Sequence, residues 1–214
     1  MALGIGGAIA ALESAAFVPV VRAGTAQAAY MAARALAAGG CEVLEIALTV
    51  PEAIDVLARL KADGHVVGAG TVLTTDQAAS AIAVGADFLV APSLNAEVVA
   101  LCRAGDRLMI PGALTPTEVI AALATGAPIV KIFPVDAVGG PRYLKLLSDP
   151  LPGLRTFPTG GITLDNAADY LARGAVAVGV GSALVDQAAI AAGDFEALSR
   201  RAGVWKRRLS PKST

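Results

Sequence analysis

Short runs of apolar, often β-branched residues alternate along this chain with longer segments whose apolar residues recur at helical spacing. The runs predict eight β-strands, at residues 17–22, 43–48, 65–71, 87–91, 108–110, 129–133, 155–158 and 176–180. The segments between and after them predict α-helices at residues 25–38, 51–62, 75–83, 95–104, 116–124, 141–147, 164–173 and 195–204. The apolar stretch 1–12 predicts one more short helix at the N-terminus.

The ends of these helices carry their own signals. Asn95 and Thr115 each precede a helical segment and offer a side-chain oxygen to the free amides of its first turn. Pro116 suits the first helical position, where no amide hydrogen bond is lost. Gly64 and Gly174 follow helical segments and can adopt the left-handed conformation that closes a helix. These signals support the regular alternation of strands and helices.

Strands separated by helices indicate parallel βαβ crossovers, and eight of them predict a single (β/α)8 TIM barrel, an α/β fold. We expect one domain over residues 1–214, with the short helix at its start. The alternative is an open, doubly wound sheet. That fold would favour a Gly-x-Gly-x-x-Gly turn after the first strand, where this chain has Arg-Ala-Gly-Thr at residues 22–25.

Composition narrows the function. The 214 residues are 55% hydrophobic but 4% aromatic, so the core must be built mainly from small aliphatic side chains. Seventeen basic and 18 acidic residues leave a net charge of -1, which argues against nucleic acid or a membrane surface as a partner. Two cysteines, Cys41 and Cys102, are too few for a disulfide framework. The single histidine, His65, is too few for a His-based zinc site. The N-terminal apolar stretch lacks a basic flank, so we expect a cytoplasmic protein.

Lys131 is the sharpest polar interruption of a predicted strand. The alternation of side chains turns it toward the barrel interior, together with Ile129 and Phe133. An ammonium in an apolar interior loses hydration, which lowers its pKa and leaves a neutral amine that can form a Schiff base with a carbonyl. The alternative is a lysine that is buried for packing and paired with a carboxylate.

Glu45 interrupts the second strand in the same way, because Leu44 and Ile46 face the helices and Glu45 faces inward. A carboxylate and a lysine inside one barrel favour each other's charged forms, while desolvation opposes them. We expect Glu45 to move protons as a general acid and base. A plain ion pair with Lys131 is the alternative.

Glycines and a serine follow the last two strands. Gly160 and Gly161 come after the seventh strand and Ser182 after the eighth, where barrels commonly bind phosphate through loop amides. Arg22, at the end of the first strand, could hold a phosphate or a carboxylate, and Thr71 offers a hydroxyl beside open glycine backbone. Ordinary turns and structural roles are the alternatives for all five.

Six segments in order resemble the blocks of the 2-keto-3-deoxy-6-phosphogluconate (KDPG) and 4-hydroxy-2-oxoglutarate (KHG) aldolase family. They are residues 43–46, 68–73, 110–118, 130–134, 158–162 and 179–184. The resemblance implies a homotrimeric class I aldolase with no metal or cofactor. The implied substrates are a 2-keto acid and a phosphorylated aldehyde: KDPG would be cleaved to pyruvate and glyceraldehyde 3-phosphate.

The resemblance also implies roles for individual residues. Lys131 would form the Schiff base, Glu45 would shuttle protons and Thr71 would contact the pyruvate carboxylate. Gly160, Gly161 and Ser182 would receive the phosphate. Some members carry an arginine as a carboxylate ligand where this chain has Thr49, so Arg22 is the candidate for the missing charge.

The resemblance leaves the preferred substrate open. KHG and the galactonate-derived analogue of KDPG are alternatives, because the phosphorylated compounds differ only in the configuration of one hydroxyl. A sugar-phosphate isomerase or epimerase is a rival, although those enzymes commonly need a catalytic histidine or a metal. A non-catalytic barrel that binds a phosphorylated ligand is the remaining alternative.

Overall fold

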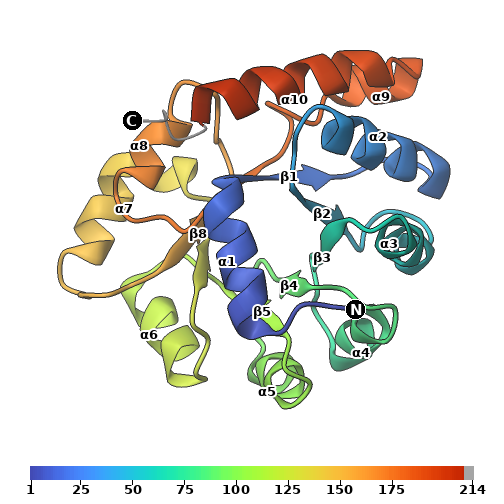
Figure 1. Ribbon diagram of the computed structural model, residues 1–214. Helices are drawn as coiled ribbons and strands as arrows, with labels where there is room; N and C mark the ends of the chain where they lie inside the picture. The colour runs from blue at the N-terminus through green and yellow to red at the C-terminus, as the bar shows by residue number, and fades with distance from the viewer. Residues whose placement is uncertain (210–214) are drawn as a thin grey trace.

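The computed structural model describes residues 1–209, which form parallel strands wrapped by helices (Figure 1). The strands are β1 (Phe17–Val21), β2 (Val43–Ala47), β3 (Val66–Gly70), β4 (Phe88–Val90), β5 (Leu108–Ile110), β6 (Gly112–Ala113), β7 (Val130–Ile132), β8 (Thr156–Pro158) and β9 (Val178–Val180). The helices are α1 (Ile5–Ala15), α2 (Ala26–Ala38), α3 (Ala53–Ala62), α4 (Thr75–Ala83), α5 (Ala96–Ala104), α6 (Pro116–Ala124), α7 (Gly140–Ser148), α8 (Ala167–Leu171), α9 (Gln187–Ala192) and α10 (Phe195–Leu209). A 3-10 turn, η1, covers Asp136–Val138.

Two curled parallel sheets form the centre. One has six strands in the order β5-β4-β3-β2-β1-β9, and the other has three in the order β6-β7-β8. Pro111, which has no amide hydrogen to donate, separates β5 from β6. Isolated bridges at Thr156–Ala175 and Thr159–Gly179 connect β8 with the β9 side. The α/β barrel prediction is confirmed as a TIM-barrel-like fold, with a continuous ladder over six strands, half a barrel, rather than around a closed ring.

Apolar side chains fill two layers. The outer layer lies between the strands and the surrounding helices and contains, for example, Leu44, Ile46 and Val130. The inner layer lies inside the curled sheet, where Phe88 and Phe157 pack under α1. Helix α1 crosses the N-terminal end of the strands, the face seen in Figure 1. The reactive end of a parallel barrel is the opposite one, where the strands end.

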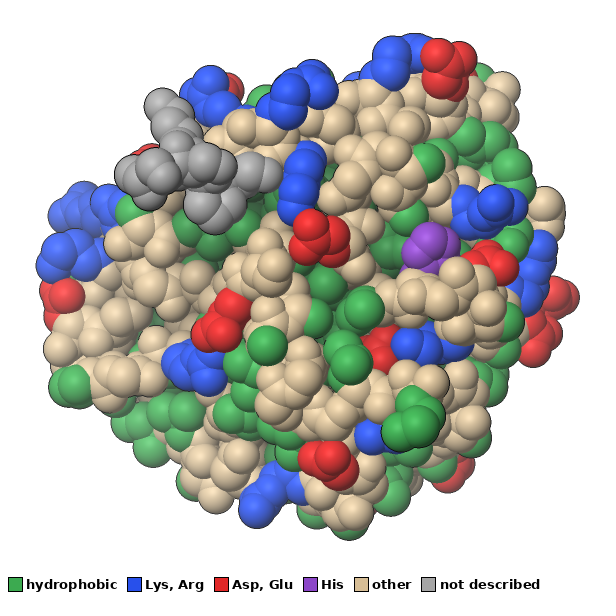
Figure 2. Space-filling model, viewed as in Figure 1, with side chains coloured by type: hydrophobic (Ala, Val, Ile, Leu, Met, Phe, Trp, Pro, Cys, Tyr) green, Lys and Arg blue, Asp and Glu red, His purple; other side chains and the backbone are tan. Residues whose placement is uncertain are grey.

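The face covered by α1 carries basic and acidic side chains interspersed with hydrophobic ones (Figure 2). None of the helices within residues 1–209 combines the length and apolar character that crossing a membrane requires.

Three helix predictions need correction. The N-terminal helix covers Ile5–Ala15 rather than 1–12. The helix predicted at 164–173 covers Ala167–Leu171, because Thr163 and Asn166 each bond the other's backbone amide and form a turn before it. The last helix extends to Leu209, since Trp205 packs against Phe17 with ring centroids 5.7 Å apart.

Helix α9 and the turn η1 were not predicted. Asp186 accepts hydrogen bonds from the amides of Ala188 and Ala189 at the start of α9, and Gly193 ends it with a φ of 71°. These are the cap and stop signals that identified the other helices. The helix was missed because it has only six residues.

Candidate active site

Lys131 lies in β7, and its burial follows from the alternation of that strand. Val130 and Ile132 pack in the outer apolar layer, so Lys131 points to the interior and is 4% exposed. Its Nζ atom lies 5.1 Å from the centre of the Phe133 ring. The apolar side chains that pack beneath α1 cannot solvate an ammonium group. The predicted inward orientation of Lys131 is therefore what the fold produces.

Glu45 projects from β2 into the same interior and is 1% exposed. A β-carbon built on Gly70 of the neighbouring strand would lie 2.1 Å from Glu45 Oε1, so only glycine leaves room for the carboxylate. Glu45 Oε2 is buried without a hydrogen-bond partner. Buried polar atoms without partners are rare, and each calls for a functional or structural reason.

Burial shifts both groups toward their neutral forms. Desolvation raises the pKa of the Glu45 carboxyl above its usual range, and the positive charges of Lys131 and Arg22 partly offset this shift. Desolvation lowers the pKa of the Lys131 amine below its usual range, and the Glu45 carboxylate opposes that shift. Within residues 1–209 no ion pair at 4.0 Å or less joins the two side chains. The interior thus holds a potential nucleophile and a potential proton carrier.

A cavity of about 280 Å³ opens where β1, β8 and β9 end. Four of the predicted substrate-binding residues line it: Arg22, Gly160, Gly161 and Ser182. Phe133, next to Lys131 in the chain, lines the same cavity. Arg22 is the one charged side chain among these lining residues, and it supplies positive charge beside the glycine amides. The cavity is therefore suited to an anionic group such as phosphate.

Two other predicted residues do not line this cavity. Thr71 is half-buried at the end of β3 and has a φ of 60°, a strained conformation for a threonine. Thr49 is exposed in the turn after β2. Thr49 follows β2, which carries Glu45, and Thr71 follows β3, which pairs with β2. Neither residue is among those that line the cavity beside Arg22.

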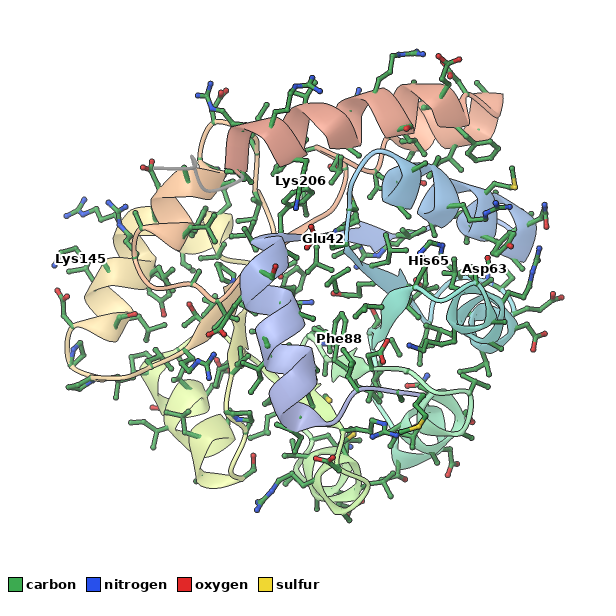
Figure 3. All side chains as sticks on the ribbon, viewed as in Figure 1. Glu42, Asp63, His65, Phe88, Lys145 and Lys206 are labelled. Carbon is green, nitrogen blue, oxygen red and sulfur yellow. The ribbon has the colours of Figure 1, made fainter. Side chains whose placement is uncertain are left out.

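His65 lies away from the site. It precedes β3 on the face covered by α1, near Asp63 (Figure 3). Lys206 and Glu42 form an ion pair of 2.6 Å on the same face. His65 therefore lies at the end of the barrel opposite the one where the strands end.

Sequence reasoning missed three residues of the site. Phe133 lines the cavity and faces the Lys131 amine, Thr159 is buried at the cavity wall, and Gly70 makes room for Glu45. Alternation did turn Phe133 inward, but sequence reasoning assigned it no role at the site. Thr159 lies two positions after the inward-facing Phe157, so alternation could have identified it. Gly70 gave no such signal, because its role depends on a neighbouring strand.

A parallel barrel-like fold with a desolvated lysine and a carboxylate beside an anion cavity is the arrangement of lysine-dependent, class I aldolases. The comparison with known proteins agrees. A sequence model described as "Aldolase: KDPG and KHG aldolase" matches residues 8–201. The chain therefore belongs to the KDPG and KHG aldolase family.

Several relatives cover most of this chain. It is 40% identical to "2-dehydro-3-deoxy-phosphogluconate aldolase" of Treponema pallidum, over 86% of this chain and 89% of that one. It is 35% identical to "KHG/KDPG aldolase" of Escherichia coli K12, over 86% and 88%. A Legionella pneumophila KDPG aldolase, solved with pyruvate "as a covalent carbinolamine intermediate", superimposes with a TM-score of 0.85 at 32% identity, over 92% and 97%.

Proposed function

We propose that this chain is a class I aldolase that cleaves KDPG to pyruvate and glyceraldehyde 3-phosphate, with Lys131 as the Schiff-base lysine. The observation that carries the proposal is the burial of Lys131 and Glu45 in one interior, next to the cavity lined by Arg22, Gly160 and Ser182. Family membership and the carbinolamine trapped in the Legionella relative support the same chemistry.

The first half of the reaction forms the Schiff base. The neutral amine of Lys131 attacks the C2 ketone of the substrate and gives a carbinolamine. Glu45, whose protonated form is favoured by burial, donates a proton to the departing hydroxyl, which leaves as water. The resulting iminium, with C2 now bonded to the Lys131 nitrogen, attracts electrons from the neighbouring carbons.

The second half breaks the C3–C4 bond. The Glu45 carboxylate removes the proton of the C4 hydroxyl, and the C4 oxygen forms a carbonyl as the bonding electrons move into the iminium. Glyceraldehyde 3-phosphate leaves, and the enamine on Lys131 remains. Protonation at C3 and addition of one water at C2 release pyruvate and restore the amine. The water lost in the first half is thereby regained.

The remaining predicted residues bind the two ends of the substrate. The amides of Gly160 and Gly161 and the hydroxyl of Ser182 receive the phosphate, with Arg22 adding charge. The hydroxyl of Thr71 contacts the pyruvate carboxylate. Thr49 contributes a hydroxyl near that end, where other members carry an arginine.

The substrate alternatives follow from relatives that differ in their names. The E. coli relative is described as acting on both KHG and KDPG, and another structure, described as "Native KDPGal structure", matches with a TM-score of 0.77 at 30% identity. We rank KDPG first, because the cavity after β8 and β9 suits a phosphate that KHG does not carry.

We also infer a cytoplasmic homotrimer with one domain over residues 1–214 and no requirement for a cofactor or metal. One matching structure, 30% identical with a TM-score of 0.78, is a cage "designed by fusing symmetric oligomeric domains", which supports a symmetric oligomer. Light scattering of the purified chain gives the number of subunits.

Reductive trapping tests the proposed chemistry. The protein is incubated with pyruvate and borohydride, with and without EDTA, and the adduct is located by peptide mass spectrometry. We expect a pyruvate-derived mass on Lys131 in both samples, and none after Lys131→Ala. An adduct on another lysine, or equal trapping by the Ala variant, would contradict the assignment. Cleavage assays with KDPG, KHG and the galactonate-derived analogue then rank the substrates.

A further inference from the structure

The turn that follows the strand of Lys131 packs directly behind the glycine pair of the anion cavity. The amide of Asp136 donates to the carbonyl of Gly160 at 3.2 Å, and the amide of Val135 donates to the carbonyl of Thr159 at 3.0 Å. A β-carbon built on Gly161 would lie 2.1 Å from Asp136 Cβ and 2.9 Å from Asp136 Oδ2. The Asp136 side chain therefore lies against the backbone of Gly161.

Asp136 is exposed, and no basic side chain among the described residues pairs with its carboxylate at 4.0 Å or less. A β-carbon built on Gly140 would lie 3.1 Å from the buried hydroxyl of Tyr170 and 3.9 Å from Asp136 Oδ1, and among residues 1–209 this hydroxyl has no hydrogen-bond partner. Burial and the Asp136 charge raise the pKa of Tyr170 to about 12, so the phenol stays neutral. Asp136 thus places one negative charge against Gly161, a residue that lines the cavity.

Resting on the function proposed above, we infer that Asp136 is a specificity-determining residue that weakens binding of the phosphate end of the substrate. A phosphate group on the Gly160 and Gly161 amides would lie across one turn of backbone from the carboxylate. Like charges at that range repel, and the repulsion opposes the attraction from Arg22 and the amides. Asp136 therefore reduces the preference of the enzyme for phosphorylated over unphosphorylated 2-keto acids. It also speeds release of the phosphorylated aldehyde.

The test compares KDPG with 2-keto-3-deoxygluconate, which lacks only the phosphate. Asp136→Asn keeps the size and packing of the side chain against Gly161 and removes its charge. We expect the ratio of kcat/KM for KDPG to that for the unphosphorylated compound to rise by about three- to tenfold, as for charges near solvent. The change should come from a lower KM for KDPG.

Asp169→Asn is the matched control, because Asp169 is exposed on α8 and the substitution changes the net charge equally. It should leave the ratio within twofold of the original. The difference in KM for KDPG between the original chain and Asp136→Asn should shrink as ionic strength rises, since salt screens the repulsion.

Two results would overturn the inference. One is an unchanged ratio in Asp136→Asn, with KM for KDPG equal to that of the original chain at low salt. The other is a parallel loss with both compounds, which would make Asp136 a structural support of the loop. Failure of the proposed function is a separate outcome: the original chain would then show no pyruvate adduct and no cleavage of KDPG.

Discussion

Two lysines of this chain lie near buried carboxylates, and their surroundings differ. The Lys61 amine is 2.6 Å from Asp87 Oδ2 and also donates to the carbonyl of His65. Asp87 is fully buried, yet both of its oxygens accept backbone amides, from Leu3 and Val67. Within the part of the chain that the structure describes, no ion pair joins Lys131 to Glu45, and one oxygen of Glu45 has no hydrogen-bond partner.

The difference separates a structural pair from a reactive one. Asp87 and Lys61 tie the segment before α1 to β3 and α3, and both carboxylate oxygens of Asp87 accept hydrogen bonds. Among residues 1–209 Glu45 Oε2 has no hydrogen-bond partner, and desolvation shifts the pKa of both Lys131 and Glu45 toward their neutral forms. Unused buried polar groups are what a substrate requires, because it brings the missing partners.

The largest expected effect concerns the two lysines, Lys131 and Lys61. Lys131→Met should abolish aldol cleavage and pyruvate trapping, because no amine remains to form the Schiff base. Lys61→Met should retain trapping and kcat within about threefold, since its amine lies on the face covered by α1, while lowering stability. Cleavage and trapping assays below the melting temperature check both variants. Trapping lost in the Lys61 variant alone would reverse the assignment.

The next largest effect concerns the two carboxylates, Glu45 and Asp87. Glu45→Gln should slow cleavage by about 10² to 10⁴-fold, the range of a positioned acid and base. Asp87→Asn should leave kcat nearly unchanged in the folded protein and lower the melting temperature, because it weakens the bond to the Lys61 amine. Steady-state kinetics of the two variants supply the measurement. A loss below tenfold for Glu45→Gln would show that Glu45 is not the general acid and base of the reaction.

The pH dependence tests the coupling within the reactive pair. As pH rises, the rate of trapping with pyruvate and cyanoborohydride should increase about tenfold per pH unit until the pKa of Lys131 is reached, and then level off. That inflection should lie below the ordinary lysine pKa of about 10.4. Glu45→Gln should move this inflection to lower pH, because the Glu45 carboxylate raises the pKa of Lys131. An inflection that stays in place or moves to higher pH would contradict the coupling. Asp87→Asn should leave it unchanged.

Gly70 offers a smaller, steric test. Gly70→Ala places a methyl group where Glu45 Oε1 lies, so the carboxylate must shift and kcat should fall by about tenfold or more. Gly6→Ala is the control, because nothing lies within 4 Å of its added methyl group and Gly6 is on α1. A Gly70 variant that is folded by circular dichroism and fully active would show that Glu45 does not need its observed position.

The smallest expected effect is on stability. Lys131→Met with Glu45→Gln should raise the free energy of unfolding by about 1 to 4 kcal/mol, as when buried charges give way to neutral groups. Lys61→Met with Asp87→Asn should lower it. The original chain should gain stability as pH rises from the lowered pKa of Lys131 to about 10.4, because the unfolded chain binds the extra proton there. The first double variant should lose that slope in denaturant titrations.

Much of the fold could be predicted from the sequence. Strand and helix positions followed from apolar periodicity, and Asn95 and Thr115 do cap their helices in the structure. The errors fell at ends and short elements. Thr163 and Asn166 made a turn that their types alone did not distinguish from a cap, and α9 was too short to show a period.

The candidate site could also be predicted only in part. Alternation predicted that Lys131 and Glu45 face inward, and the structure buries both side chains. The sequence placed Gly160, Gly161 and Ser182 after the last two strands and Arg22 after the first, and in the structure all four line one cavity, while their roles in substrate binding stay predictions. Thr71 and Thr49 stay predictions, since no geometry of the described residues joins them to a ligand. The fit of Glu45 against Gly70 could not be predicted, because it depends on the register between β2 and β3.

The sequence by itself determined what is local: the order of strands and helices, the face to which each strand residue points, and the family blocks. Tertiary structure alone decided which groups meet. It satisfied Asp87 with Lys61 and two amides, left Glu45 Oε2 without a partner, and set Asp136 behind Gly161. The reason is that side-chain direction follows from backbone periods of two and 3.6 residues, whereas hydrogen bonding and desolvation depend on neighbours distant in the chain.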